Sequence, residues 1–192
     1  VVENALSIFD RSNQTLNATS EWRIRWWTKI LDYTVDGPYF WDGKGFGINL
    51  ADDDGFQVNA DGSLRAPHNG HLELLARGGV PLLALWILLQ VAYVATLLRA
   101  ALRARAAGMA FWVRVCGWIF VYWAAAFVNA TFDVYLQGPM GGIWFWSMMG
   151  LGIAVAGIIN REIVGDEASD AGAPKPAGGA GGAVATPAGA RP

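Results

Sequence analysis

Three long uncharged segments stand out along the chain. Residues 78–98, 115–132 and 141–159 contain no Asp, Glu, Lys or Arg. About 20 apolar residues in a helix cross the roughly 30 Å hydrocarbon layer of a membrane. The pattern predicts transmembrane helices over residues 78–98, 115–132 and 143–160.

The basic residues between these segments predict an orientation. Residues 99–114 carry four arginines, whereas residues 133–142 contain no lysine or arginine. Basic residues in short loops mark the cytoplasmic side of a membrane. We therefore expect residues 99–114 inside, and residues 1–77 and 133–142 outside.

The segment before the first span is predicted to be external and partly helical. A Thr-Ser pair before Glu21 indicates a helix over about residues 20–35, and Asn69 as an N-cap indicates a membrane-surface helix over about residues 69–77. At about 100° per residue, the first helix gathers its apolar residues on one broad face. That face comprises Trp22, Trp26, Trp27, Ile30, Leu31 and Tyr33.

Three short polar runs lie between the two predicted helices. Residues 43–49 carry glycine at every second position, which favours unusual turns or a backbone close to a ligand. Their spacing matches no nucleotide-binding loop. Asp52, Asp53 and Asp54 lack the spacing of a calcium loop and favour a solvated turn over a metal site. Residues 59–62 indicate a hairpin turn.

The composition agrees with a membrane protein. Hydrophobic residues make up 54% of the 192 residues and charged residues 16%, against about 25% in soluble domains. A net charge of −2 without an extended basic stripe argues against nucleic acid as a partner. The single cysteine, Cys116, excludes a disulfide framework. We predict a mainly α fold, an integral membrane helical bundle fragment with three transmembrane helices.

The two ends of the chain differ from its middle. The chain opens on Val1 with neither a methionine nor a signal-peptide pattern. We expect a C-terminal piece of a longer protein, whose N-terminal transmembrane helices would be partners of this piece. Residues 161–192 become rich in Ala, Gly and Pro and are predicted to form a disordered cytoplasmic tail.

Arg23 is the polar residue that falls within the predicted aromatic face. It lies between Trp27 and Ile30 around the helix, where an unpaired guanidinium would be costly. One interpretation is that it reaches lipid headgroups or stacks on Trp27. The other is that it presents a fork of donors to a phosphate or a carboxylate.

Two histidines lie at the start of the membrane-surface helix. His68 precedes the predicted cap Asn69, and His71 follows one turn later. Histidine has an ordinary pKa of about 6.5, which suits proton transfer near neutrality. A hydrogen bond within the loop is the alternative role for either histidine.

In combination, these features resemble the O-antigen ligase and polymerase family of bacterial envelope enzymes. The likeness covers roughly residues 1–160 and depends on the order and spacing of several motifs together. These motifs are Arg23 four residues before Trp27, the glycine run at residues 43–49, His68-Asn69 followed by Leu72, Leu75 and Gly78, and residues 133–139.

The resemblance implies a multi-pass protein of the bacterial inner membrane with its active site facing the periplasm. It implies transfer of a glycan from an undecaprenyl diphosphate carrier to a hydroxyl of lipid A core, of another glycan or of a protein. The family uses neither a metal nor another cofactor. Arg23 and His68 match a functional arginine and a functional histidine of the family, and a further arginine would lie in the absent N-terminal part.

The resemblance also implies roles for individual residues. We expect Arg23 to hold the diphosphate and His68 to accept the proton of the acceptor hydroxyl, with His71 as a competitor for that base. Beyond the lipid-linked donor and the acceptor, membrane lipid is an expected partner. The expected substrate-binding residues are Trp26, Trp27, Gly45, Gly47, Asn69 and His71.

A non-catalytic role is the main alternative. A membrane scaffold or regulatory subunit of an envelope polysaccharide assembly complex would leave Arg23 and His68 on different surfaces. A transporter is disfavoured because the predicted spans contain no acid or base apart from the arginines at their ends.

Overall fold

The structure, a computed structural model, describes residues 14–134, 136 and 138–172. Within these ranges it contains helices and no strand. The helices are α2 (Gln14–Val35), α3 (Leu50–Asp54), α4 (Gly70–Ala106), α5 (Ala110–Asn129) and α6 (Pro139–Gly172). The helices α4, α5 and α6 are long and apolar enough to cross a membrane. The prediction of a mainly α fold with three membrane-length helices is confirmed.

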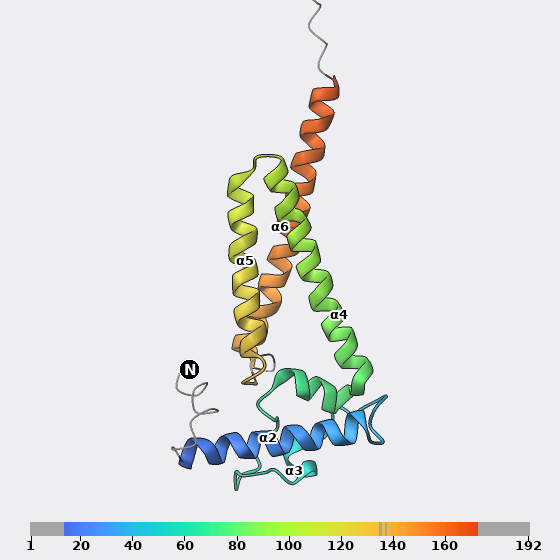
Figure 1. Cartoon of the computed structure of the whole chain (residues 1–192), viewed down its shortest axis with the longest axis vertical. Coiled ribbons are helices and arrows are strands. Elements are labelled where there is room, and N and C mark those ends of the chain that lie inside the picture. Colours follow the sequence, from blue (N-terminus) through green and yellow to red (C-terminus); the bar gives the residue numbers. More distant parts are fainter. Residues whose placement is uncertain (1–13, 135, 137, 173–192) are drawn as a thin grey trace, which may run out of the picture.

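The three long helices pack side by side into a column (Figure 1). Large side chains such as Tyr93, Ile119 and Phe145 fill its centre. Others, including Leu88 and Val121, point outward and are more than half exposed. Apolar side chains both inside and outside are expected of a bundle whose outer surface contacts lipid.

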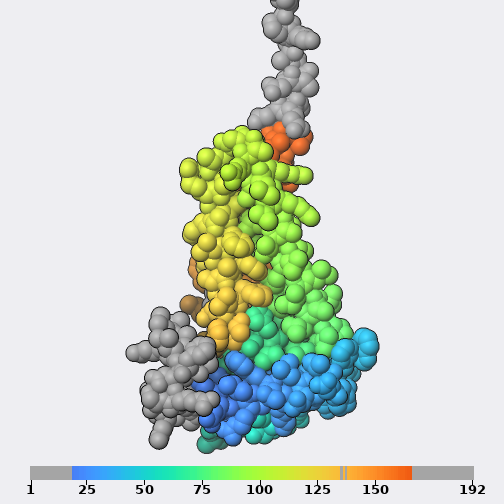
Figure 2. All heavy atoms as spheres, in the orientation of Figure 1, coloured from blue at the N-terminus to red at the C-terminus, as the bar shows by residue number. Residues whose placement is uncertain are grey.

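A platform formed by α2, α3 and the first part of α4 closes one end of this column. The helix α2 lies across the end, with α3 beneath it (Figure 1), and Figure 2 shows α2 running the width of the base. The first part of α4 packs on α2 through a second core. This core contains Trp26, Ile30, Leu50, Ala51, Leu75 and Ala76, all at most 2% exposed.

The helix α4 bends sharply at Gly79, between its platform part and its membrane-length part. Gly79 has φ 69° and ψ −171°, outside the helical region. The amide of Val80, freed by the bend, donates to the carbonyl oxygen of Phe40 at 2.8 Å. Pro81 then lies in the first turn of the next helical stretch, where its missing N–H removes no hydrogen bond.

Alanine at Gly79 is expected to destabilise the protein by about 2 kcal/mol or more. Its Cβ would lie 2.3 Å from the carbonyl oxygen of Phe40, at a φ that side chains disfavour. The matched control is Gly117→Ala in α5, where an added Cβ meets nothing within 4 Å. Thermal unfolding in detergent should show a lower midpoint for Gly79→Ala only, and equal midpoints would contradict this account.

The last helix extends further than the sequence pattern predicted. Residues 161–192 were predicted to be disordered, but α6 continues to Gly172; residues 173–192 lie outside the described ranges. At the end of the predicted span, Arg103 donates to Asn160 Oδ1 at 2.8 Å, and at the start of the extension Trp112 donates to Glu162 Oε2 at 2.9 Å. The structure differs from the prediction over residues 161–172, which are helical.

Residues 59–62 form the predicted turn, but not as part of a hairpin. The amide of Gly62 donates to the carbonyl oxygen of Asn59 at 3.0 Å. The residues on either side of the turn form no strand. The backbone around the turn is instead bonded by side chains. Gln57 donates to the carbonyl oxygen of Leu64 at 3.0 Å, and Asn49 donates to the carbonyl oxygen of Gly62 at 3.3 Å.

Candidate active site

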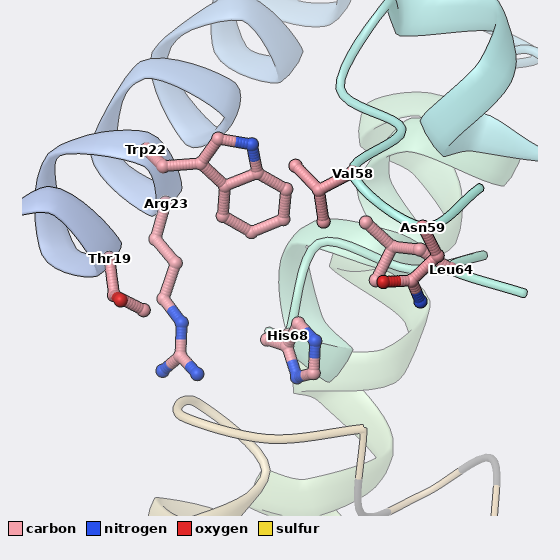
Figure 3. A pocket seen from close by; sticks show the side chains of 7 residues that line it. All are labelled: Thr19, Trp22, Arg23, Val58, Asn59, Leu64 and His68. Atoms are coloured by element: carbon pink, nitrogen blue, oxygen red, sulfur yellow. The ribbon is translucent and has the colours of Figure 1, made fainter.

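Arg23 and His68 line one pocket between α2 and the start of α4. The pocket has a volume of about 420 Å³ and opens at the surface of the platform. In Figure 3 the guanidinium of Arg23 and the imidazole of His68 extend toward the same space from opposite walls. The lining residues are Thr19, Trp22, Arg23, Val58, Asn59, Leu64 and His68.

Arg23 enters this pocket with unused hydrogen-bonding capacity. One terminal nitrogen, Nη1, donates a long hydrogen bond of 3.4 Å to the carbonyl oxygen of Phe132. Its Nε is buried and has no partner among the described residues. A buried donor without a partner costs about 1–3 kcal/mol, and an anion in the pocket would remove that cost.

The backbone at His68 is held in an unusual conformation by its two neighbours. His68 has φ 51°, in the left-handed region that non-glycine residues rarely adopt. Before it, the carbonyl oxygen of Pro67 accepts a 2.7 Å hydrogen bond from Trp27 Nε1. After it, Asn69 caps α4 by accepting from the amides of His71 and Leu72. Such strain persists only where its surroundings enforce it, and it is common at functional sites.

These contacts give Trp27 and Asn69 structural roles. Arg23 and Trp27 lie one turn apart on α2, so that one side chain lines the pocket and the other holds the loop that carries His68. Neither Trp27 nor Asn69 lines the pocket. In the structure they hold the loop that carries His68.

Asp133 comes next to His68 from the other end of the chain. Its Oδ1 lies 3.6 Å from His68 Nδ1, close enough for an ion pair once the imidazole is protonated. Asp133 was not among the residues predicted to act in the site. The signal was present, because Asp133 is the only acidic residue among residues 78–160.

His71, the competing histidine, is occupied by contacts within the bundle. Its Nδ1 accepts a 3.0 Å hydrogen bond from Trp86 Nε1. Its Nε2 lies 3.2 Å from the carbonyl oxygen of Phe127. Because Nδ1 accepts and a carbonyl can only accept, the proton resides on Nε2 and no lone pair remains for a substrate. Of the two histidines, His68 lines the pocket with Arg23, whereas His71 is bonded within the bundle.

Trp26 is fully buried and has no ring face available to a sugar. Its ring stacks on Phe56 at a centroid distance of 5.3 Å, and its Nε1 donates to Asp54 Oδ2 at 2.7 Å. The expectation that Trp26 contacts substrate is therefore wrong. A helical wheel places Trp26 on the aromatic face but does not tell which part of that face α3 covers.

Asp54 is the centre of a buried polar cluster rather than part of a solvated turn. Tyr33 donates to its Oδ2 at 3.3 Å, and Lys44 Nζ pairs with Asp54 and, at 2.6 Å, with Asp53. Burial and the charge of Asp54 raise the pKa of Tyr33. Burial by itself would lower the pKa of Lys44. The hydrogen bonds to Asp53 and Asp54 and the charges of both carboxylates outweigh that effect, so the pKa of Lys44 is raised. The aspartate run thus anchors the glycine run that carries Lys44.

The glycine run wraps around Arg77 and stays outside the Arg23–His68 pocket. Arg77 Nη1 donates to the carbonyl oxygens of Gly45, Phe46 and Ile48 at 3.2–3.3 Å. The amide of Gly45 donates back to Arg77 O at 2.9 Å. The structure does not bring Gly45 or Gly47 together with Arg23 and His68, and the backbone freedom of the run serves this wrapping.

The segment that forms the pocket is also the one that matches a known family. Residues 1–87 match the O-antigen ligase family model. The resemblance found in the sequence is thus confirmed for this part of the chain. All seven lining residues of the pocket lie within residues 1–87, the segment that matches the family model. Phe132 and Asp133, which contact Arg23 and His68, lie outside that segment. No curated protein and no solved structure matches the chain.

Within the described ranges, no group of three or more His, Cys, Asp or Glu side chains could hold a metal ion. The acidic residue nearest the candidate base is Asp133, which is exposed. The pocket therefore combines one guanidinium and one imidazole, and the carboxylate of Asp133 lies beside that imidazole. This set can bind a phosphate group and remove a proton from a hydroxyl.

Proposed function

We propose that this protein transfers a glycan from an undecaprenyl diphosphate carrier to an acceptor hydroxyl, as an O-antigen ligase or polysaccharide polymerase. The observation that carries the proposal is that Arg23 and His68 face one pocket, with the Arg23 Nε buried and without a partner in the part of the chain that the structure describes. The family match and the three membrane-length helices support it. The site faces the periplasm of the inner membrane, following the arginine-rich turn between α4 and α5.

Arg23 binds the diphosphate of the donor. As the bond between the sugar C1 and the phosphate oxygen breaks, its electron pair passes to the diphosphate, and negative charge builds on that group. A fixed guanidinium stabilises this charge more in the transition state than in the bound donor. A diphosphate held in this way leaves as a stable anion, so the step requires no metal ion.

His68 acts on the acceptor. Its imidazole takes the proton of the attacking hydroxyl while the hydroxyl oxygen forms a bond with C1 on the face opposite the diphosphate. The imidazolium formed in this step lies 3.6 Å from the carboxylate of Asp133, which stabilises it. The proton then passes to solvent or to the departing diphosphate, and His68 is restored.

Glycan transfer by the intact protein in detergent is the direct test. With a lipid-linked oligosaccharide donor and a lipid A core, glycan or protein acceptor, one acceptor should be glycosylated. Transfer should persist in excess EDTA, since Arg23 supplies the positive charge. Loss of transfer in EDTA and its recovery with Mg²⁺ would contradict the proposed mechanism, and no transfer to any acceptor would favour the scaffold alternative.

A further inference from the structure

A second cavity lies against the platform part of α4, within the angle that this helix makes at Gly79. Its volume is about 260 Å³. Gly70, Glu73, Leu74 and Arg77 contribute to its wall and lie on one face of α4. The lining residues are Phe46, Gly70, Glu73, Leu74, Arg77, Trp86, Leu136 and Trp146.

Glu73 brings a carboxylate oxygen with no partner to this cavity. The Glu73 side chain is only 5% exposed. Its Oε1 accepts a 2.7 Å hydrogen bond from Arg77 Nε, whereas its Oε2 is buried and has no partner among the described residues. Buried acceptors are almost always satisfied in proteins. A ligand that donates a hydrogen bond would satisfy this one.

The charge of Glu73 limits the chemistry of that ligand. Arg77 already neutralises the carboxylate, and its Nη1 is used by the carbonyl oxygens of the glycine run. An ionised phosphate has no hydrogen-bond donor to offer Glu73 Oε2, and Arg77 Nη1 is already bonded to the carbonyl oxygens of the glycine run. A hydrocarbon chain has no donor to offer Oε2. An uncharged ligand with a hydroxyl group fits both conditions.

The remaining walls are aromatic and apolar. Phe46 is 68% exposed and Trp146 is 50% exposed, so both rings keep surface for a ligand. Trp86 is buried, and its ring centroid lies 6.0 Å from the ring centroid of Trp146. A sugar ring carries hydroxyl donors at its edge and apolar C–H groups on its faces. It therefore complements a carboxylate oxygen surrounded by aromatic rings.

We propose that this cavity binds one sugar residue of the glycan substrate, with Glu73 Oε2 accepting from a sugar hydroxyl and the rings of Phe46 and Trp146 contacting its apolar face. The proposal rests on the proposed function, because it takes the ligand to be the glycan that is transferred or extended. The cavity begins at Gly70, directly after the His68-Asn69 pair, so a bound sugar lies next to the segment that carries the base.

The test measures binding without catalysis. The intact protein in detergent is titrated calorimetrically with the repeat-unit oligosaccharide released from the host's own surface polysaccharide. Glu73→Gln keeps an acceptor oxygen for Arg77 but replaces the free carboxylate oxygen by a donor. Binding should weaken about tenfold or more, as for loss of a hydrogen bond to a charged group. The matched control, Asp32→Asn on the exposed face of α2, should bind like the unmodified protein.

A second variant covers the case in which Glu73→Gln folds poorly. Phe46→Ala removes an exposed ring, and binding should weaken roughly three- to tenfold. Unchanged binding in both variants would overturn the proposal, as would undecaprenyl phosphate occupying the cavity while the oligosaccharide does not bind. Failure of the proposed function would look different, because the unmodified protein would then transfer no glycan to any acceptor, whether or not the oligosaccharide binds and whether or not Glu73→Gln weakens that binding.

Discussion

Alanine at His68 is expected to reduce kcat for glycan transfer by about 10²–10⁴-fold, the range for loss of a general base. The imidazole lines the pocket with Arg23, and its backbone is held at φ 51° by the contacts of Pro67 and Asn69. The measurement is single-turnover transfer by the purified intact protein, with donor binding determined separately. Donor affinity should change little, because the diphosphate is held by Arg23.

The matched control for this variant is His71→Ala. His71 is bonded to Trp86 and Phe127 within the bundle, so its loss should lower the unfolding midpoint and leave kcat of the folded protein near its normal value. The opposite pattern, with transfer lost in His71→Ala and kept in His68→Ala, would exchange the roles of the two histidines and refute the assignment.

The helices of the column could be predicted because a membrane imposes a simple length and composition requirement. Residues 78–98 fall inside α4 and residues 115–132 overlap α5. The boundaries of these helices were predicted less accurately, since a helix can continue where neighbouring elements contact it. The helix α6 continues past residue 160, where Trp112 donates to Glu162, and a hydropathy pattern carries no information about that contact.

Arg23 and His68 are the part of the candidate site that the sequence predicted. Arg23 and His68 each depart from the local pattern, a cation on an aromatic face and an imidazole before a helix cap, and the family resemblance then favoured a functional role for both. Their meeting in one pocket depends on the loop that Trp27 holds to α2. Trp26 was misjudged because only the fold tells that α3 and Phe56 cover it. Asp133 was missed because its approach to His68 requires α4 and α5 to be in place.

Alanine at Arg23 is expected to reduce kcat/KM for the lipid-linked donor by about 10²–10³-fold, as for removal of one group that stabilises charge in a transition state. Lysine at this position should recover part of that loss, because it keeps the charge but lacks the planar fork that engages two phosphate oxygens. The graded order, arginine above lysine above alanine, separates an electrostatic role from simple packing. If Arg23 acted only by packing, Arg23→Met, which fills a similar volume without charge, would retain more transfer than Arg23→Ala and at least as much as Arg23→Lys.

The control for Arg23 lies on the same helix. Arg25 is exposed and donates a long 3.4 Å hydrogen bond to Glu21 O, so Arg25→Ala should change kcat/KM by less than about twofold. Donor binding, measured with an undecaprenyl diphosphate analogue, should weaken in Arg23→Ala and stay unchanged in Arg25→Ala. Equal transfer by the two variants would mean that the buried Nε of Arg23 serves the fold alone, and the diphosphate would then have to be held by residues outside this pocket.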